Sequence, residues 1–217
     1  MLGAGATIAA LTSKNITVNS CILSGQVDAR QHRPQLPDLH ADIQKAEQIL
    51  GINKTILGPF PNIAFNSVPH LQLVQFIEAA ILETGADLIF THHPGDLNND
   101  HLHTSLACQA AARLFQRKAD APRLRGLFFM EILSSTDWAF RSSNNPFQAD
   151  TFFPVGETLG KKIAALQAYR GVMRDFPHPR SEEIVRGLAA YRGGQAGMDY
   201  AEGFQTAFHA LGQLGGW

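Results

Sequence analysis

The sequence has no excess of charge of either sign, because its 217 residues carry 18 basic and 19 acidic side chains. Proteins that bind nucleic acid or an anionic membrane usually present a basic surface, so a small or weakly charged partner is expected instead. The chain also lacks an apolar run near the roughly 20 residues that span a bilayer, and its start lacks the charged region of a signal peptide. These absences predict a cytoplasmic protein that binds neither nucleic acid nor a membrane.

Cysteine is scarce, since Cys21 and Cys108 are the only two. Cys21 lies in an apolar run and Cys108 in a helical pattern, where a buried free thiol is the common case, so neither a disulfide nor a metal-binding thiol is expected. Internal repeats and low-complexity linkers are absent as well. With 45% hydrophobic residues, the length and composition predict one domain over residues 1–217 with a single buried core.

Short apolar runs alternate with longer segments of helical periodicity. In residues 68–85, for example, Val74, Ile77 and Ile81 recur on one helical face, and Gly85 stands where a helix end is expected. Such alternation predicts an α/β fold with a mostly parallel sheet covered on both faces. The residues after about 156 are expected to be helical and to pack over that sheet. The expected strands are residues 15–23, 54–57, 87–90 and 124–133.

Four of the nine histidines lie in one segment, THHPGDLNNDHLHT at residues 91–104. The segment follows an expected strand, and ligands bind at the carboxyl ends of strands in such sheets. Asp100 is expected to begin the next helix as its N-cap. A neutral imidazole is the commonest protein ligand for zinc, yet the spacing matches no closed motif such as HExxH. The residues alone therefore indicate a metal-dependent hydrolase, with surface or backbone-bonded histidines as the alternative.

Seven stretches spread over nearly the whole chain resemble the LmbE-like, or PIG-L, family of zinc-dependent N-deacetylases. They are LGAGATIA (2–9), KAEQILGI (45–52), FTHHPGDLNNDH (90–101), EILSSTDW (131–138), KKIAALQAY (161–169), FPHPRS (176–181) and YAEGF (200–204). The resemblance implies a Rossmann-like three-layer fold and a hydrolase that removes the acetyl group from an N-acetylglucosamine-type sugar or conjugate. It implies zinc as the cofactor and leaves a homo-oligomer open.

The chain departs from the family at its start. In the family, the segment resembling residues 2–9 directly follows a His-Pro-Asp-Asp-Glu motif, which supplies two zinc ligands and the general base, and a central first strand precedes that motif. The resemblance therefore implies that the first strand and the motif are missing here. A helix starting at Leu2 would also lack an N-cap side chain for its free amides. Either the chain is truncated and active at full length, or it is a noncatalytic sugar- or metal-binding relative.

The family's motif gives roles to residues of the histidine segment. His101 matches the third zinc ligand, and Asp100 resembles the residue that orients this ligand. Asn98 stands where the family places a histidine that stabilises the oxyanion and helps the amine to leave. An asparagine can donate a hydrogen bond but not a proton, so Asn98 can fill only the first of these roles.

Proton donation would then fall to another imidazole of the segment. His93, or else His92, is expected to act as the acid or to contact the substrate, and Asp96 is expected to hold that imidazole charged. Aromatic faces stack on sugars and arginine forks bond hydroxyl or carboxylate groups, whereas the alternative for each such residue is an ordinary surface or loop position. The further residues expected to contact the sugar are Arg30, Trp138, His178 and Arg180.

Overall fold

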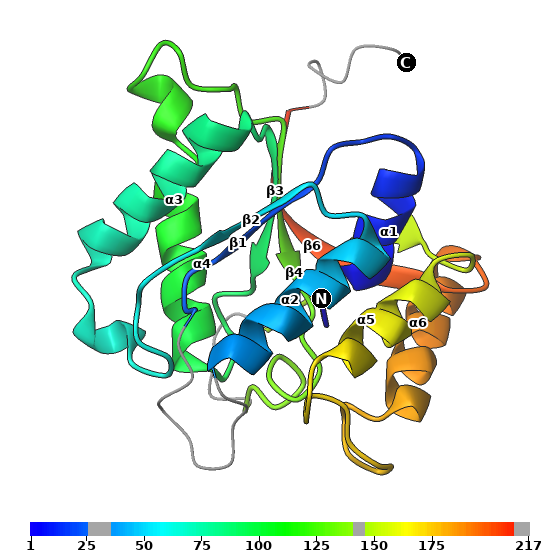
Figure 1. Ribbon diagram of the computed structural model, residues 1–217. Helices are drawn as coiled ribbons and strands as arrows, with labels where there is room; N and C mark the ends of the chain where they lie inside the picture. Colours follow the sequence, from blue (N-terminus) through cyan, green and yellow to red (C-terminus); the bar gives the residue numbers. More distant parts are fainter. Residues whose placement is uncertain (26–35, 141–145, 211–217) are drawn as a thin grey trace.

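The computed structural model describes residues 1–25, 36–140 and 146–210. The helices and strands within these ranges alternate along most of the chain, as predicted, and Figure 1 shows their arrangement. The helices are α1 (Gly5–Ser13), α2 (Leu36–Leu50), α3 (His70–Thr84), α4 (Asn99–Ala111), α5 (Leu159–Ala168) and α6 (Glu182–Ala196). The strands are β1 (Asn19–Ile22), β2 (Lys54–Leu57), β3 (Leu88–His92), β4 (Gly126–Met130), β5 (Thr151–Pro154) and β6 (Ala201–His209).

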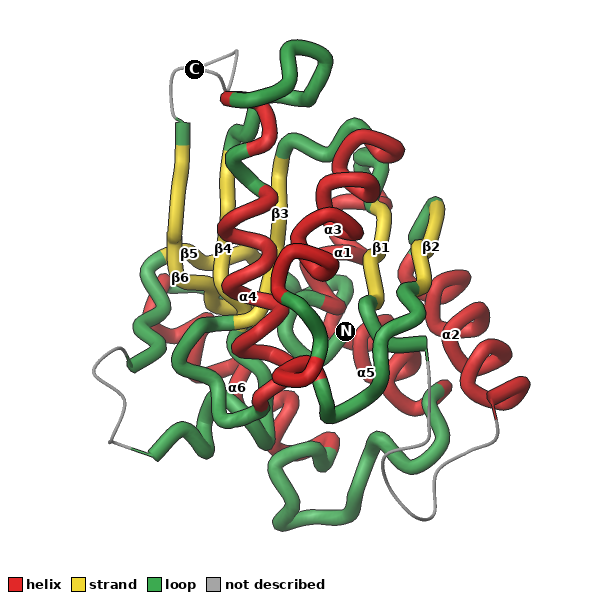
Figure 2. The backbone as a smooth tube through the Cα atoms, turned by 90° about the vertical axis from the view of Figure 1, so that its left-hand side faces the viewer, coloured by secondary structure: helices red, strands yellow, loops and turns green. Residues whose placement is uncertain are grey.

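The strands form two sheets, and the α/β class is confirmed. β1 pairs in parallel with β2, and the second sheet has the order β3–β4–β6–β5. β3 and β4 are parallel, with His92 opposite Met130, whereas β6 runs antiparallel to both β4 and β5. Within the described ranges, β1 and β3 each have a partner strand on one side only. In Figure 2, β1 and β2 continue the row of β4 and β3 across the molecule.

Helices cover both faces of the strands, which is the layering that the alternation predicted (Figure 1). On one face, α3 and α4 bury a core that includes Ile77, with Ile89 of β3 packed against it. On the other face, Ala4 at the start of α1 contacts Phe128 of β4 and Phe204 of β6. α2 and α5 pack against each other and against α1. The carboxyl ends of β3 and β4 therefore emerge between two layers of helices.

The C-terminal end of α3 and the N-terminal end of α1 are stabilised in different ways. Gly85 closes α3 in the left-handed conformation with a φ of 65°, as the glycine predicted. The residue before α1 supplies no side-chain cap. Instead, the carboxylate of Glu202 accepts hydrogen bonds from the amides of Ala6 (3.2 Å) and Thr7 (2.7 Å). A residue of the last strand therefore caps the first helix, which no local sequence pattern could reveal.

The prediction for the last third of the chain was wrong in one respect. α5 and α6 are present, but residues 201–209 form β6, which lies between β4 and β5. The inner half of this strand is buried without alternation, since the polar side chain of Glu202 is buried beside Ala201 and Phe204. Strand periodicity was therefore absent from the sequence. The short strand β5 was not predicted either.

Two expectations from composition can be compared with the structure. Cys21 and Cys108 are free thiols, as predicted, but only Cys108 is buried while Cys21 is exposed. Among the described residues, no helix has both the length and the apolar character needed to cross a membrane.

Candidate active site

The histidine segment lies at the carboxyl end of β3, as predicted. β3 ends at His92, and α4 begins at Asn99 after a short loop. The N-cap of α4 is Asn98, whose side-chain oxygen accepts a 2.9 Å hydrogen bond from the amide of Asp100. The prediction that Asp100 is the N-cap was therefore wrong, because the helix begins at Asn99 and Asn98, two residues before Asp100, is its cap.

Asp100 uses its carboxylate to bind another loop. Its oxygens accept hydrogen bonds from the backbone amides of Ile63 (2.5 Å) and Phe65 (3.1 Å). These contacts hold the segment before α3 against the first turn of α4. Asp100 was expected to orient His101, whereas its carboxylate binds this loop instead.

The carboxylate beside His101 belongs to Asp96. Oδ2 of Asp96 lies 3.1 Å from Nδ1 of His101, and the hydroxyl of Thr136 donates to the same oxygen at 3.0 Å. The hydroxyl of Ser135 donates to the other carboxylate oxygen. The Asp96 side chain is fully buried, whereas 22% of the His101 side chain is exposed. A buried carboxylate therefore binds the His101 imidazole, and the imidazole itself is partly exposed.

The charge of Asp96 results from opposing effects. Burial disfavours the ionised carboxylate. The hydrogen bond and charge interaction with His101 outweigh that cost, together with hydrogen bonds from Ser135 and the backbone of Asn98. The pKa of Asp96 is therefore below its ordinary value, and the group is ionised at neutral pH.

His92 stacks on His101. The two ring centroids are 4.0 Å apart and the planes differ by 25°. Burial, and after it the proximity of His101, lowers the pKa of His92 to about 3, so this imidazole is neutral. Its Nδ1 atom is buried and has no hydrogen-bond partner among the described residues. His92 is thus the second imidazole of the site.

His93 lies below the surface with none of its area exposed. Phe129 and Phe147 enclose its ring edge-on, each with its centroid 5.5 Å away, and its Nδ1 accepts a 3.0 Å hydrogen bond from the amide of Gly95. Burial lowers the pKa of His93 more than the charge of Asp96 raises it. Asp96 was expected to hold the acid imidazole, His93 or else His92, charged. The structure instead pairs Asp96 with His101, and the pKa values of both His92 and His93 are lowered.

The described residues include no group of three or more His, Cys, Asp or Glu side chains that could hold a metal ion. His101 has the donor chemistry that zinc prefers, but a catalytic zinc usually takes three protein ligands. Even with His92, whose ring stacks on that of His101, the described residues do not supply three ligands. The described residues by themselves therefore do not fit a zinc site.

Three of the other four residues expected to bind sugar are described by the structure, and these three lie in loops. Arg30 falls outside the described residues, Trp138 is 53% exposed, and Nδ1 of His178 accepts a 3.0 Å hydrogen bond from the amide of Arg180. A hollow of about 400 Å³ lies beside the FPHPRS segment, but its lining includes neither His178 nor Arg180. The residues that line it are Gln167, Met173, Arg174, Asp175, Phe176, Glu182 and Glu183.

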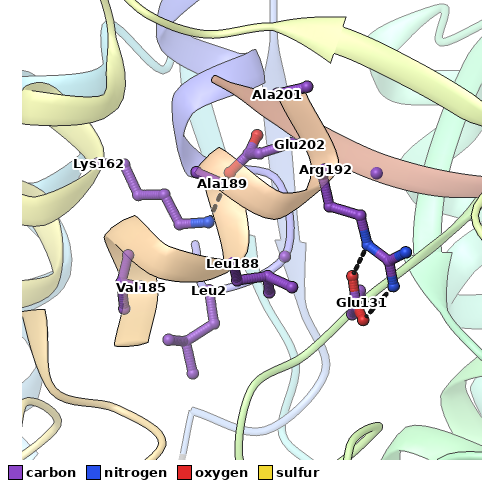
Figure 3. Close-up of a pocket in the computed structure, with 11 residues that line it drawn as sticks. Leu2, Glu131, Lys162, Val185, Leu188, Ala189, Arg192, Ala201 and Glu202 are labelled. Carbon is purple, nitrogen blue, oxygen red and sulfur yellow. Dashed lines mark hydrogen bonds and ion pairs between the residues drawn. The ribbon is translucent and has the colours of Figure 1, made fainter. Parts of the chain in front are cut away.

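A second polar cluster lies next to the start of α1 (Figure 3). Nζ of Lys162 lies 2.7 Å from the carboxylate of Glu202, and their side chains are only 5% and 4% exposed. Nearby, the guanidinium of Arg192 donates to both oxygens of Glu131 at 2.6 and 2.8 Å. The cavity between these pairs measures about 10 Å³, which is room for one water at most and not for a sugar. A lysine in a helix usually faces solvent, so no sequence signal marked Lys162 as buried.

Known proteins share this architecture. The family model described as PIG-L: GlcNAc-PI de-N-acetylase matches residues 1–112, and no curated protein matches. The conserved protein TT1542 from Thermus thermophilus is 24% identical, with a TM-score of 0.77 over 97% of this chain and 90% of that chain. GalB, the 4-carboxy-2-hydroxymuconate hydratase from Pseudomonas putida KT2440, is 17% identical, with a TM-score of 0.76 over 96% of this chain and 91% of that chain. The N,N'-diacetylchitobiose deacetylase from Pyrococcus horikoshii is 14% identical, with a TM-score of 0.72 over 94% of this chain and 78% of that chain.

Proposed function

Because the chain belongs to the PIG-L: GlcNAc-PI de-N-acetylase family, we propose that it is a zinc-dependent N-deacetylase of an N-acetylglucosamine-type sugar or conjugate. The reaction is the hydrolysis of an acetamide, in which water adds to the carbonyl and the amine leaves with a proton, giving a free amino-sugar and acetate. The observation that carries this proposal is the family match over residues 1–112, which contains the oriented imidazole of His101. A cytoplasmic location is part of the proposal.

Zinc enters this proposal through the family, with His101 as one ligand. The described residues do not complete a metal site, so the remaining ligands and the general base would come from a His-Pro-Asp-Asp-Glu motif as in the family. The strand that precedes this motif in the family would need two neighbours, and the edges of β1 and β3 that lack a partner among the described residues suit that place. Without such a motif we expect little or no activity.

The described residues contribute hydrogen bonds and shape to the reaction. The side-chain oxygen of Asn98 is occupied by the amide of Asp100, which leaves its NH₂ group as the donor that could meet an oxyanion. The ring contact with His101 makes His92 a better candidate than enclosed His93 to contact the substrate. Its pKa of about 3 leaves the ring neutral, so we assign it a hydrogen bond to the substrate and not the donation of a proton. We keep Trp138 as an aromatic face for the sugar, because it is exposed in the loop that follows β4.

A second candidate function is a noncatalytic sugar- or metal-binding relative. The observation that favours it is the absence, among the described residues, of a group of three metal-binding side chains. The fold alone does not decide between the two, since a solved structure of similar fold is named as a hydratase and another as a deacetylase.

The two functions are separated by zinc content and acetate release. We would compare this chain with a chain that carries additional upstream residues, using elemental analysis and a panel of N-acetylglucosamine derivatives. The deacetylase proposal expects one zinc and acetate release in the extended chain, and loss of both in its His101→Gln variant. The matched control is His103→Gln, two residues along the same helix, which should keep both. An extended chain that binds a sugar of the panel, does not bind zinc and does not release acetate would support the noncatalytic relative.

A further inference from the structure

Both oxygens of the Asp96 carboxylate have hydrogen-bond partners. Its Oδ1 atom accepts from the Ser135 hydroxyl and, at 2.9 Å, from the amide of Asn98. Its Oδ2 atom accepts from the Thr136 hydroxyl at 3.0 Å and lies 3.1 Å from Nδ1 of His101. The side chain is fully buried, so these partners fix it from several directions. An ionised carboxylate can only accept hydrogen bonds, which determines what His101 must do at that contact.

The contact selects one form of the His101 ring. A neutral imidazole carries its single N–H on either Nδ1 or Nε2, and only the Nδ1–H form can donate to Asp96. The lone pair then resides on Nε2, at the far edge of the ring, and 22% of the side chain is exposed. Asp96 thereby leaves Nε2 as the unprotonated nitrogen of a partly exposed ring.

The serine beside this pair is not arranged as a nucleophile. In a Ser-His-Asp triad, the serine and the carboxylate bind different ring nitrogens, so that the imidazole can take the serine proton. Here Oγ of Ser135 lies 3.4 Å from Nδ1 of His101, the same nitrogen that Asp96 engages, and it donates to Asp96. Ser135 and Thr136 therefore serve the carboxylate.

We propose that Asp96, held by Ser135 and Thr136, is the positioning residue that fixes the tautomer and direction of the His101 imidazole. The inference rests on the proposed function for its catalytic meaning, since His101 is the residue to which that function assigns the reaction centre. It links two loops that are distant in sequence, because Asp96 follows β3 while Ser135 and Thr136 follow β4. The EILSSTDW segment thus contributes support to the histidine as well as an exposed tryptophan.

The first readout is spectroscopic and needs no activity. Long-range ¹H–¹⁵N correlation spectra of this chain, at about pH 8.5 and well above the ordinary imidazole pKa of about 6.5, report which nitrogen carries the proton. The His101 signals are assigned by their loss in His101→Gln. We expect the Nδ1–H form in the parent chain and a shift towards the Nε2–H form in Asp96→Asn. The side-chain NH₂ group of the asparagine can donate to an unprotonated Nδ1, whereas the carboxylate of Asp96 can only accept from Nδ1–H. An unchanged tautomer in a folded Asp96→Asn variant would overturn the inference.

The second readout is kinetic, in the extended chain. We expect Asp96→Asn to lower kcat about 10- to 100-fold with little change in KM, as is typical when a residue behind an active-site histidine is lost. Ser135→Ala and Thr136→Ala keep the carboxylate and should give smaller losses. The matched control is Asp137→Asn, which removes an exposed carboxylate of the same loop that bonds the amide of Ser135 and not His101.

The outcomes separate the inference from the function on which it rests. If no extended chain releases acetate, the deacetylase proposal falls, and the tautomer of His101 still decides the role of Asp96. If acetate is released and Asp96→Asn matches Asp137→Asn in both tautomer and kcat, the deacetylase stands and the positioning role is wrong.

Discussion

The Glu202 side chain combines a buried ion pair with a helix cap. Its carboxylate binds Lys162 and accepts from the amides of Ala6 and Thr7. Glu202→Ala would leave a buried ammonium and two helix amides without a partner. We expect the free energy of unfolding to fall by about 3–5 kcal/mol, the range seen when one partner of a buried pair is removed. Urea unfolding followed by circular dichroism measures this loss.

Two further variants serve as controls for the loss of stability in Glu202→Ala. Glu157→Ala removes an exposed glutamate and should change the free energy of unfolding by about 0.5 kcal/mol or less. Glu202→Gln keeps an oxygen for the α1 amides but loses the charge that Lys162 needs, so its loss should fall between the two. A loss in Glu202→Ala of about 1 kcal/mol or less would mean that the pair behaves like an exposed one.

At the same scale, the sequence allowed the location of the histidine segment at the end of a strand to be predicted, but not the side-chain pairings within it. The position of His101 followed from the strand before it and from a family motif. Its partner did not, because the contact depends on a loop in which the side chain of Asp96 accepts from the amide of Asn98 and turns towards α4. The hydroxyls that hold Asp96 come from another strand's loop, and no spacing in the sequence encodes that approach.

At the scale of elements, α6 offers a matched pair of neighbouring glycines. A Cβ atom on Gly193 would lie 2.6 Å from the carbonyl oxygen of Met198 and 2.8 Å from that of Asp199, because the chain folds back there towards β6. A Cβ on Gly194 meets nothing within 4 Å. We expect Gly193→Ala to lower the free energy of unfolding by about 1–3 kcal/mol through backbone displacement. Gly194→Ala should raise it by about 0.5–1 kcal/mol, since alanine suits a helix interior better.

The measurement is chemical unfolding of both variants beside the parent chain. Opposite signs for the two substitutions are the expected result, with equal denaturant dependence in all three proteins. Two substitutions of the same sign would show that the turn after α6 is not the constraint at Gly193.

Elements were predictable where local signals agreed. β2 was placed within its observed limits, and the end of α3 followed from Gly85. β6 was missed because its buried half carries Glu202 and Gly203 in place of alternating apolar residues, and because its neighbours in the sheet come from earlier parts of the chain. Long-range pairing decided this strand, and local propensity did not.

At the scale of the whole molecule, the histidines couple folding to pH. The pKa of His92 is about 3 in the folded protein, against about 6.5 for an ordinary imidazole, and that of His93 is lowered too. As the pH falls below about 6.5, the unfolded chain binds these protons before the folded protein does. The stability that the neutral rings contribute is therefore complete above that pH and is lost progressively towards about pH 3.

We expect the free energy of unfolding of the metal-free protein to decrease steadily from about pH 7 to about pH 4, with a smaller slope in His92→Gln than in the parent chain. The comparison is made by urea unfolding at several pH values, and the difference in slope isolates His92, because His93 and the carboxylates titrate in both proteins. The whole-molecule cause is the position of His92 at the end of β3, where the ring is partly buried and its Nδ1 atom is shielded from water, so a charged ring is poorly solvated. Equal slopes would mean that His92 becomes charged inside the folded protein, and that its stacked arrangement with His101 opens readily to solvent.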